Sequence, residues 1–252
     1  MLNGEEKEPN IEQNNLFDIT KKDDEEKPLI IQRIIILSLG LAGLFLMSFL
    51  LSAILAAFGI EDTTTRSSIA TFASYVLVFT AMLFVLGKNI TCIKGHFGTP
   101  KNYLIGLGFG ILLIVFPIIY KYILSFFQPT TISDNESSLR ATITVFPILS
   151  TIVFGIIGPL VEESTYRFSL FSLFKNKWVA YMVSVFVFAL LHFNFLSDNI
   201  VNELLNLPTY LFAGLILAIC YHCFGLAGSM TAHITNNLFS IIVYIITINM
   251  VS

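Results

Sequence analysis

Charged residues are scarce in this chain of 252 residues. They make up 12% of the sequence, whereas hydrophobic residues make up 55%. A soluble domain usually carries about 25% charged residues. The composition therefore excludes an ordinary soluble domain, and we expect no nucleic-acid partner. We interpret the chain as an all-α, polytopic membrane helical bundle in the lipid bilayer.

Cysteine is also rare, with three residues in the whole chain: Cys92, Cys220 and Cys223. Cys220 and Cys223 form a C-x-x-C at the end of an apolar run, but no second such pair follows, as a zinc site would need. Small apolar cysteines are common in buried helices. We interpret all three as packing residues, and His222 as a side chain at the membrane interface.

The few charges are concentrated at the N-terminus. Residues 1–28 hold nine of the seventeen acidic and four of the fourteen basic residues, which gives this segment a charge of −5 and the remainder +2. The segment lacks apolar periodicity, so we predict a disordered cytoplasmic tail. A cleavable signal peptide would instead place a short basic region before a short apolar one.

Long apolar runs fill the rest of the chain. A helix needs about 20 apolar residues to cross the hydrocarbon core of a membrane. Such runs predict about seven transmembrane helices, at 29–60, 69–87, 103–127, 142–174, 178–195, 207–224 and 229–250. We assign the first three to an N-terminal region, 29–141, and the last four to a second domain, 142–250.

The distribution of lysine and arginine predicts the orientation, because short cytoplasmic loops are enriched in both residues. With the N-terminus in the cytoplasm, the outer loops contain only Arg66 and Arg140, and Lys121 lies near the outer end of its span. Apart from Arg167, the remaining basic residues fall on the inner side, in loops or at the end of a span: Lys7, Lys21, Lys22, Lys27, Arg33, Lys88, Lys94, Lys101, Lys175 and Lys177. The sequence therefore predicts a multi-pass protein of the cell membrane, and its composition suggests a bacterial source.

Three ionisable residues stand inside one predicted span: Glu162, Glu163 and Arg167. A charge at the centre of a membrane helix costs at least about 2.5–3.5 kcal/mol, so such residues indicate a functional site. The next spans carry His192 and His233. Glu163 and His192 lie 13 and 16 residues from Asn176 on either side of the intervening turn, which places both at a similar depth.

Residues four apart lie on one helix face, so Glu163 can pair with Arg167, and His233 shares a face with Asn237. Glu162 points about 100° away from Glu163 and cannot share its partner in the same way. We therefore expect one polar cluster on three helices. Asn236 also belongs to the third of these helices.

This cluster is compatible with two kinds of hydrolytic chemistry. A carboxylate beside an imidazole can take a proton from water and pass it to a leaving amine, while a second histidine and an asparagine donate hydrogen bonds to an oxyanion. Two histidines and a glutamate are also a catalytic zinc ligand set, here Glu162, His192 and His233. No serine or cysteine is placed as a nucleophile.

A proton or ion pathway is a further reading of intramembrane charges. Transporters of this kind carry inverted repeats and helices that are broken within the membrane. Pro117, Pro147 and Pro159 can break helices, but the two halves of the chain show no matching pair of interrupted segments. The sequence therefore favours hydrolytic chemistry over transport.

Three motifs occur in order on successive predicted spans: Glu162-Glu163-x-x-x-Arg167, Phe188-x-x-x-His192 and His233-x-x-x-Asn237. With these motifs the chain resembles the CPBP family of intramembrane proteases. This family comprises the type II CAAX prenyl endopeptidases and the bacterial bacteriocin-processing and immunity proteins called Abi. The resemblance covers about 142–240, and Phe168 stands where the family often has a small residue.

The resemblance implies an all-helical membrane peptidase with a chamber that faces the cytosol. It implies that Glu162 activates water with help from His192, and that Glu163 and Arg167 orient the site and balance its charge. It assigns the oxyanion to His233 and Asn237. At the resolution of helix spacing the roles of Glu162 and Glu163 can be exchanged. The family is divided between a zinc mechanism and a metal-free glutamate mechanism, and the motifs fit both.

Two functions follow from this reading. The first is hydrolysis of a peptide bond in a membrane-associated peptide or protein, such as a peptide pheromone, a bacteriocin precursor or a small membrane protein. The second is a non-catalytic immunity or scaffold protein that keeps the same fold. Substitution of Glu162, Glu163 or His192 separates the two, because it affects cleavage only.

Overall fold

The structure is a computed structural model, and it describes residues 30–87, 97–128 and 132–251. These residues form helices and connecting turns, without a β-strand among them. The tail predicted for residues 1–28 lies outside the described residues, as does Cys92. The all-α fold that the composition predicts is therefore confirmed for the described part of the chain.

Five helical stretches among the described residues are long and apolar enough to cross a membrane. The first comprises α1 (Ile30–Ser38), a π-helical segment η2 (Leu39–Gly43) and α2 (Leu44–Ala57), and the second is α3 (Thr63–Leu86). The third is α5 (Pro100–Leu124). The fourth runs from Pro147 to Leu173, and the fifth is α10 (Ile200–Val251).

The expected count of about seven spans differs from this number for two reasons. Helix α9 (Lys177–Leu191) is apolar but has only 15 residues. The other two expected spans, 207–224 and 229–250, are continuous in α10, with one non-helical residue at Gly225 (φ 70°, ψ −173°). A positive φ costs glycine little, so the chain kinks there without a loop.

Two of the polar stretches between the expected spans, at 128–141 and 196–206, are partly helical. Helix α6 (Asp134–Val145) begins inside the break expected between Gln128 and Arg140, because Ser133 caps it by accepting a hydrogen bond from the Glu136 N–H. Helix α10 begins at Ile200, inside the break expected between Ser197 and Asn206. Polar composition marked these segments as lying outside the apolar core, but it did not exclude helix.

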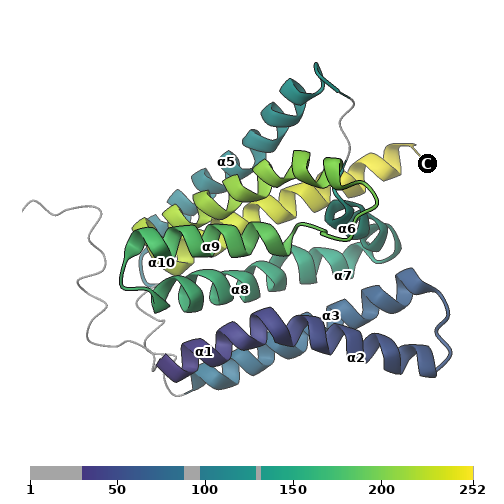
Figure 1. Ribbon diagram of the computed structural model, residues 1–252, viewed down its shortest axis with the longest axis horizontal. Helices are drawn as coiled ribbons and strands as arrows, with labels where there is room; N and C mark the ends of the chain where they lie inside the picture. The colour runs from purple at the N-terminus through teal and green to yellow at the C-terminus, as the bar shows by residue number, and fades with distance from the viewer. Residues whose placement is uncertain (1–29, 88–96, 129–131, 252) are drawn as a thin grey trace, which may run out of the picture.

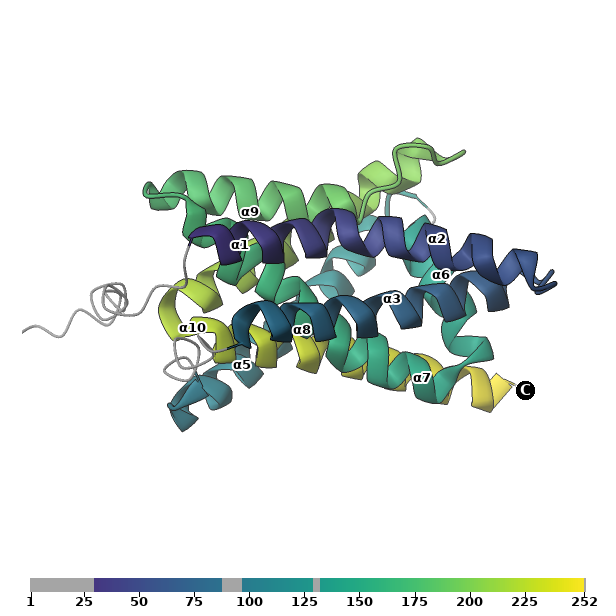
Figure 2. The same cartoon turned by 90° about the horizontal axis from the view of Figure 1, so that it is seen from below.

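The helices form a bundle in which α1, α2 and α3 lie along one side of the segment that contains α7 and α8 (Figure 1). Helix α10 runs through the bundle and packs against both α5 and α9. Figure 2 shows the same bundle from below, with the start of α9 and the end of α2 at opposite ends. Helix α10 is therefore central in the bundle, and it carries the predicted site residue His233 between its neighbours.

Small residues bring α5 and α10 into backbone contact. A Cβ atom added to Gly106 would lie 2.6 Å from the carbonyl oxygen of Gly228, and one added to Gly110 would lie 2.7 Å from Cβ of Thr235. Membrane helices commonly associate through such small residues, because these let the backbones approach closely. On the other face of α5, a Cβ atom at Gly108 would meet nothing within 4 Å.

We expect Gly106→Ala to lower the thermal stability of the protein in detergent micelles, because the new methyl group pushes α5 away from α10. Gly108→Ala is the matched control two residues away. It should leave stability unchanged or raise it, since alanine is favoured over glycine in a helix by about 0.8–1.0 kcal/mol. Equal melting temperatures for the two variants would contradict this helix contact.

Candidate active site

The segment that carries both glutamates is an irregular helix. It contains α7 (Pro147–Ile152), the π-helical η4 (Val153–Ile157) and α8 (Gly158–Glu163). The π-helical η5 (Ser164–Leu170) and the 3₁₀ turn η6 (Phe171–Leu173) complete it. Proline lacks the N–H that an α-helix requires, and Pro159 lies in the first turn of α8. Short π-helical stretches of this kind often occur at functional sites, and two of them flank the glutamates here.

Glu163 and Arg167 form an ion pair that is fully buried. Arg167 Nη1 lies 3.2 Å from Glu163 Oε1, and neither side chain is exposed at all. Arg167 Nη2 also donates to the carbonyl oxygen of Gly214 in α10 at 3.1 Å. The guanidinium carbon lies 4.8 Å from the centre of the Phe188 ring of α9, a cation–π distance. Arg167 thus contacts two neighbouring helices as well as Glu163.

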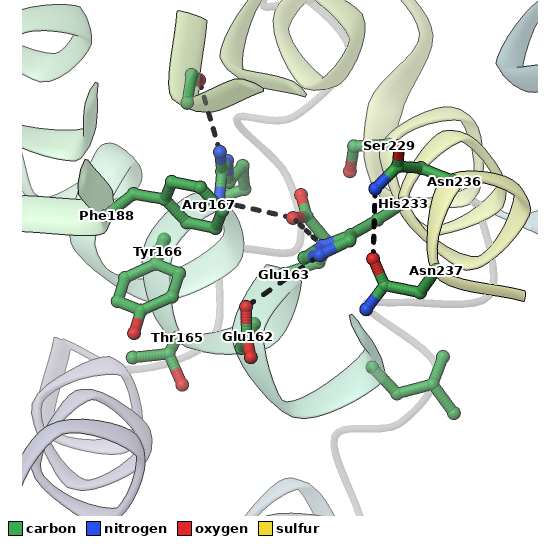
Figure 3. Close-up of polar contacts among 12 residues, drawn as sticks. Glu162, Glu163, Thr165, Tyr166, Arg167, Phe188, Ser229, His233, Asn236 and Asn237 are labelled. Carbon is green, nitrogen blue, oxygen red and sulfur yellow. Dashed lines mark hydrogen bonds and ion pairs between the residues drawn. The ribbon is translucent and has the colours of Figure 1, made fainter. Parts of the chain in front are cut away.

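His233 joins this pair from the second half of α10. Its Nδ1 lies 2.9 Å from Glu163 Oε1. Figure 3 shows the imidazole between the two glutamates, with Arg167 on the far side of Glu163. A carboxylate oxygen accepts hydrogen bonds, so Nδ1 of His233 carries the proton in this contact. The second ring nitrogen, Nε2, is directed toward Glu162, 3.8 Å from its Oε2.

Glu162 has one engaged oxygen and one without a hydrogen bond. The hydroxyl of Tyr75 in α3 donates to Oε1 at 3.3 Å. Oε2 is buried and has no hydrogen-bond partner. It lies 4.0 Å from His192 Nε2 and 3.8 Å from His233 Nε2. A buried polar atom without a partner is costly, so this oxygen is placed to take a water molecule or a proton.

The ring of His192 is oriented by its own helix. Nδ1 lies 2.8 Å from the carbonyl oxygen of Phe188. A carbonyl oxygen only accepts, so Nδ1 carries the proton, and in the neutral ring Nε2 is left as an acceptor. This contact also gives a physical reason for the Phe-x-x-x-His spacing, since residues four apart lie above one another in a helix.

Asn237 is committed to contacts beside the cluster. Its Nδ2 donates to the carbonyl oxygen of Phe154 at 2.9 Å, and its Oδ1 accepts from Asn236 Nδ2 at 3.1 Å. Both amides lie on α10 close to His233 (Figure 3). An amide nitrogen has two N–H hydrogens, and the contact with Phe154 uses one of them.

The structure brings five of the six predicted residues into direct contact. His192 and His233 each lie within 4.0 Å of Glu162, and Glu163 contacts both Arg167 and His233. The depth argument placed Glu163 level with His192, but the glutamate that faces His192 is Glu162. Asn237 shares the helix of His233 without a contact to the glutamates.

Sequence reasoning missed three contributors to the cluster. The carbonyl groups of Phe188 and Gly214 act through the backbone, which residue patterns do not reveal. Tyr75 comes from the N-terminal region, which lies outside the three motifs. Its hydroxyl is one of several in α3, so the sequence alone does not single it out. Ser229, expected at a turn, is instead buried within α10 beside Glu163 (Figure 3).

The zinc ligand set fits this geometry poorly. With bonds of about 2.0–2.1 Å, tetrahedral zinc holds its ligand atoms about 3.3–3.4 Å apart. The Glu162 oxygen lies 3.8 and 4.0 Å from the two imidazole nitrogens. Within the described ranges, no group of three or more His, Cys, Asp or Glu residues is arranged to hold a metal ion. This spacing favours a water molecule held by the side chains over a zinc ion.

Comparison with protein families gives one match, and it covers the helices of this cluster. Residues 144–239 match the model of the type II CAAX prenyl endopeptidase Rce1-like family. No solved structure gives a significant match. The matched range contains all six predicted site residues and excludes α1, α2, α3 and α5.

Curated relatives match parts of the chain. A Lactococcus lactis subsp. cremoris protein named "UPF0177 protein in abiGi 5'region" is 34% identical over 32% of this chain and 35% of its own. The protein YaiH of Lactococcus lactis subsp. lactis, also UPF0177, is 30% identical over 55% of this chain and 56% of its own. "Membrane-embedded CAAX protease MroQ" of Staphylococcus aureus is 30% identical over 53% and 55%.

The chain thus spans about half the length of YaiH and of MroQ, and less of the first relative. Two of these names carry no activity, and one is that of a membrane-embedded protease. The apolar helices indicate a multi-pass membrane protein, and the family match covers the part of it that carries the polar cluster. The match of residues 144–239 to the Rce1-like model and the similarity to MroQ agree with the resemblance to the CAAX protease and bacteriocin-processing family indicated by the three motifs.

Proposed function

We propose that this chain is an intramembrane endopeptidase, which hydrolyses a peptide bond in a membrane-associated peptide or protein. The observation that supports this most strongly is Glu162 Oε2, a buried carboxylate oxygen without a hydrogen bond that faces two imidazole nitrogens. A carboxylate in this setting is a strong acceptor for a proton of water. The peptide bond is then attacked by water, with no covalent intermediate on the protein.

In the first step Glu162 and His192 hold the water. Each presents an acceptor to it, Oε2 on one side and Nε2 on the other, 4.0 Å apart. A water molecule in hydrogen-bond contact with both fits this separation. As the water oxygen attacks the substrate carbonyl, Glu162 takes its proton and later gives it to the leaving amine.

The carbonyl oxygen of the substrate becomes an oxyanion in this step, and hydrogen-bond donors are required to stabilise its negative charge. Protonated His233 donates from both ring nitrogens, from Nδ1 to Glu163 and from Nε2 to the oxyanion. The second N–H of Asn237 is available for the same purpose. Removal of one such donor typically lowers the rate about 10²–10³-fold.

Glu163 and Arg167 position the other groups. Arg167 and a protonated His233 together balance the two negative charges of Glu162 and Glu163, which is required where no water screens them. Glu163 fixes the ring of His233 through Nδ1 at 2.9 Å. Neither side chain has any exposed surface, so neither is expected to touch substrate.

The class of substrate is inferred from the bacterial origin of the relatives as well as from the site residues. The relatives are bacterial, which supports the expectation of a bacterial cell membrane and of an unprenylated target. A peptide pheromone, a bacteriocin precursor or a small membrane protein agrees with this setting. We further propose that the N-terminus lies in the cytoplasm, on the basis of the lysine and arginine distribution.

Glu162→Gln should lower cleavage by about 10²–10⁴-fold, the usual contribution of a general base, while expression and melting temperature remain unchanged. The measurement is comparative proteomics of small membrane-bound peptides in cells that carry either chain. Glu61→Gln is the control, since Glu61 is exposed between α2 and α3. Normal processing by Glu162→Gln would instead identify an immunity or scaffold protein that does not depend on catalysis.

Arg167→Met should lower the free energy of unfolding by about 3–5 kcal/mol, because it removes the permanent cation from the buried carboxylate of Glu163. The double variant Glu163→Gln with Arg167→Met should recover part of this loss, since the uncompensated charge is gone. Denaturation in mixed micelles measures both. A double variant as unstable as the sum of the two single variants would show that the pair is not coupled.

Chelation separates the two family mechanisms. We expect 1,10-phenanthroline to leave the cleavage rate of purified protein unchanged, because the wide spacing of Glu162, His192 and His233 favours water over zinc. Cleavage that is lost with the chelator and restored by added Zn²⁺ would require these side chains to close around a metal.

A further inference from the structure

A polar hollow of about 290 Å³ lies next to the candidate active site. One wall is the first turn of α6, with Asp134, Asn135 and Ser138, and the other is the stretch from Leu191 to Asn194 at the end of α9. His192 belongs to both places. This residue lines the hollow, and its Nε2 lies 4.0 Å from the Glu162 oxygen.

Exposure of the cluster decreases with distance from this hollow. The side chain of His192 is 21% exposed, that of Glu162 13% and that of His233 6%. Glu163 and Arg167, on the far side, are not exposed at all. Of His192 and Glu162, the former is thus the more accessible, and it lies between the hollow that it lines and Glu162.

The rim of the hollow is held in place by a buried carboxylate. Glu203 of α10 has no exposed surface. Its two oxygens accept from the backbone N–H of Asp134 at 2.7 Å and from that of Asn194 at 3.1 Å. Asn194 Nδ2 also donates to Asp134 Oδ2 at 2.7 Å. Both walls are therefore tied to α10 and to each other, as expected of a preformed opening.

The hollow opens at the end of the bundle where basic residues are scarce. Helix α6 and the stretch after α9 lie at the same end as the turn between α2 and α3 (Figures 1 and 2). Of the basic residues here, Lys121 and Arg140 both bind Glu136. Burial opposes ionisation of Glu136, but these two cations outweigh it and hold the pKa of this carboxyl below its ordinary value.

The opposite end carries Arg33, Lys101, Lys175 and Lys177 at the ends of α1, α5 and α9. Short loops rich in lysine and arginine remain in the cytoplasm. The end with the hollow is then the extracytoplasmic end. This differs from the family resemblance, which implies a chamber open to the cytosol.

We propose that substrate reaches Glu162 from the extracytoplasmic face, through this hollow, as a polar, extended peptide segment. The proposal rests on the endopeptidase function proposed above. The walls offer a carboxylate, two amides and a hydroxyl, from Asp134, Asn135, Asn194 and Ser138. Such groups bind the N–H and C=O groups of a peptide, whereas a lipid chain would need an apolar groove. An exported peptide or an extracytoplasmic loop of a membrane protein fits this description.

The test uses single cysteines in a background in which Cys92, Cys220 and Cys223 are replaced by alanine. Ser138→Cys places a thiol in the hollow, and Glu61→Cys places one at the same end but between α2 and α3. Lys175→Cys marks the opposite end, and all three original side chains are exposed. Intact cells are treated with a bulky, membrane-impermeant maleimide, and labelling and substrate cleavage are then measured.

We expect Ser138→Cys and Glu61→Cys to be labelled in intact cells, and Lys175→Cys only after permeabilisation. Labelling of Ser138→Cys should lower cleavage at least tenfold relative to the same variant unlabelled, whereas labelling of Glu61→Cys should leave it unchanged. The reverse labelling pattern would overturn the extracytoplasmic assignment. Full activity of labelled Ser138→Cys would overturn the entry route.

Failure of the endopeptidase function itself gives a different result. In that case Glu162→Gln leaves processing unchanged in every background, and the substrate proposal falls with it. The labelling pattern still establishes which face of the membrane the hollow opens to. The two failures are therefore distinguishable in one set of strains.

Discussion

Two consecutive carboxylates inside an apolar bundle can remain ionised only if cations lie beside them. Here Arg167 and His233 both contact Glu163, and His233 also faces Glu162. Desolvation of a charge costs several kcal/mol, and close ion pairs offset much of that cost. This requirement fixes the arrangement of three helices, since Arg167 also binds Gly214 in α10 and stacks on Phe188 in α9. Glu163 Oε1 contacts both Arg167 and His233, whereas Glu162 Oε2 has no hydrogen-bond partner.

The backbone makes this arrangement possible. Glycines in α5 allow α10 to approach closely, and a Cβ atom at Gly40 in the first span would collide with the side chain of Thr165, two residues after Glu163. The π-helical turns on both sides of α8 change the direction in which successive side chains point. Both glutamates lie in α8 and approach the same imidazole through different nitrogens, Glu163 toward Nδ1 and Glu162 toward Nε2.

The sequence predicted the helical class, the helical segments around 142–174 and 178–195 and the pairing of Glu163 with Arg167. Hydropathy and helix periodicity are strong signals at that level. The sequence placed Glu163 level with His192 by depth and, through the family resemblance, paired Glu162 with His192, and in the structure Glu162 faces His192. It placed a turn at residues 224–228, where one glycine kinks a continuous helix. Tyr75 and the backbone carbonyls were missed because long-range contacts to an apolar span leave no local pattern.

The central claim is that Glu162, His192 and His233 converge on one water-filled position inside the bundle. A crystal structure in lipid at a resolution that shows ordered water tests it directly. The account predicts a water molecule about 2.7–3.2 Å from both Glu162 Oε2 and His192 Nε2, the range of ordinary hydrogen bonds. A dry site, or side chains of Glu162 and His192 turned away from each other, would contradict the account.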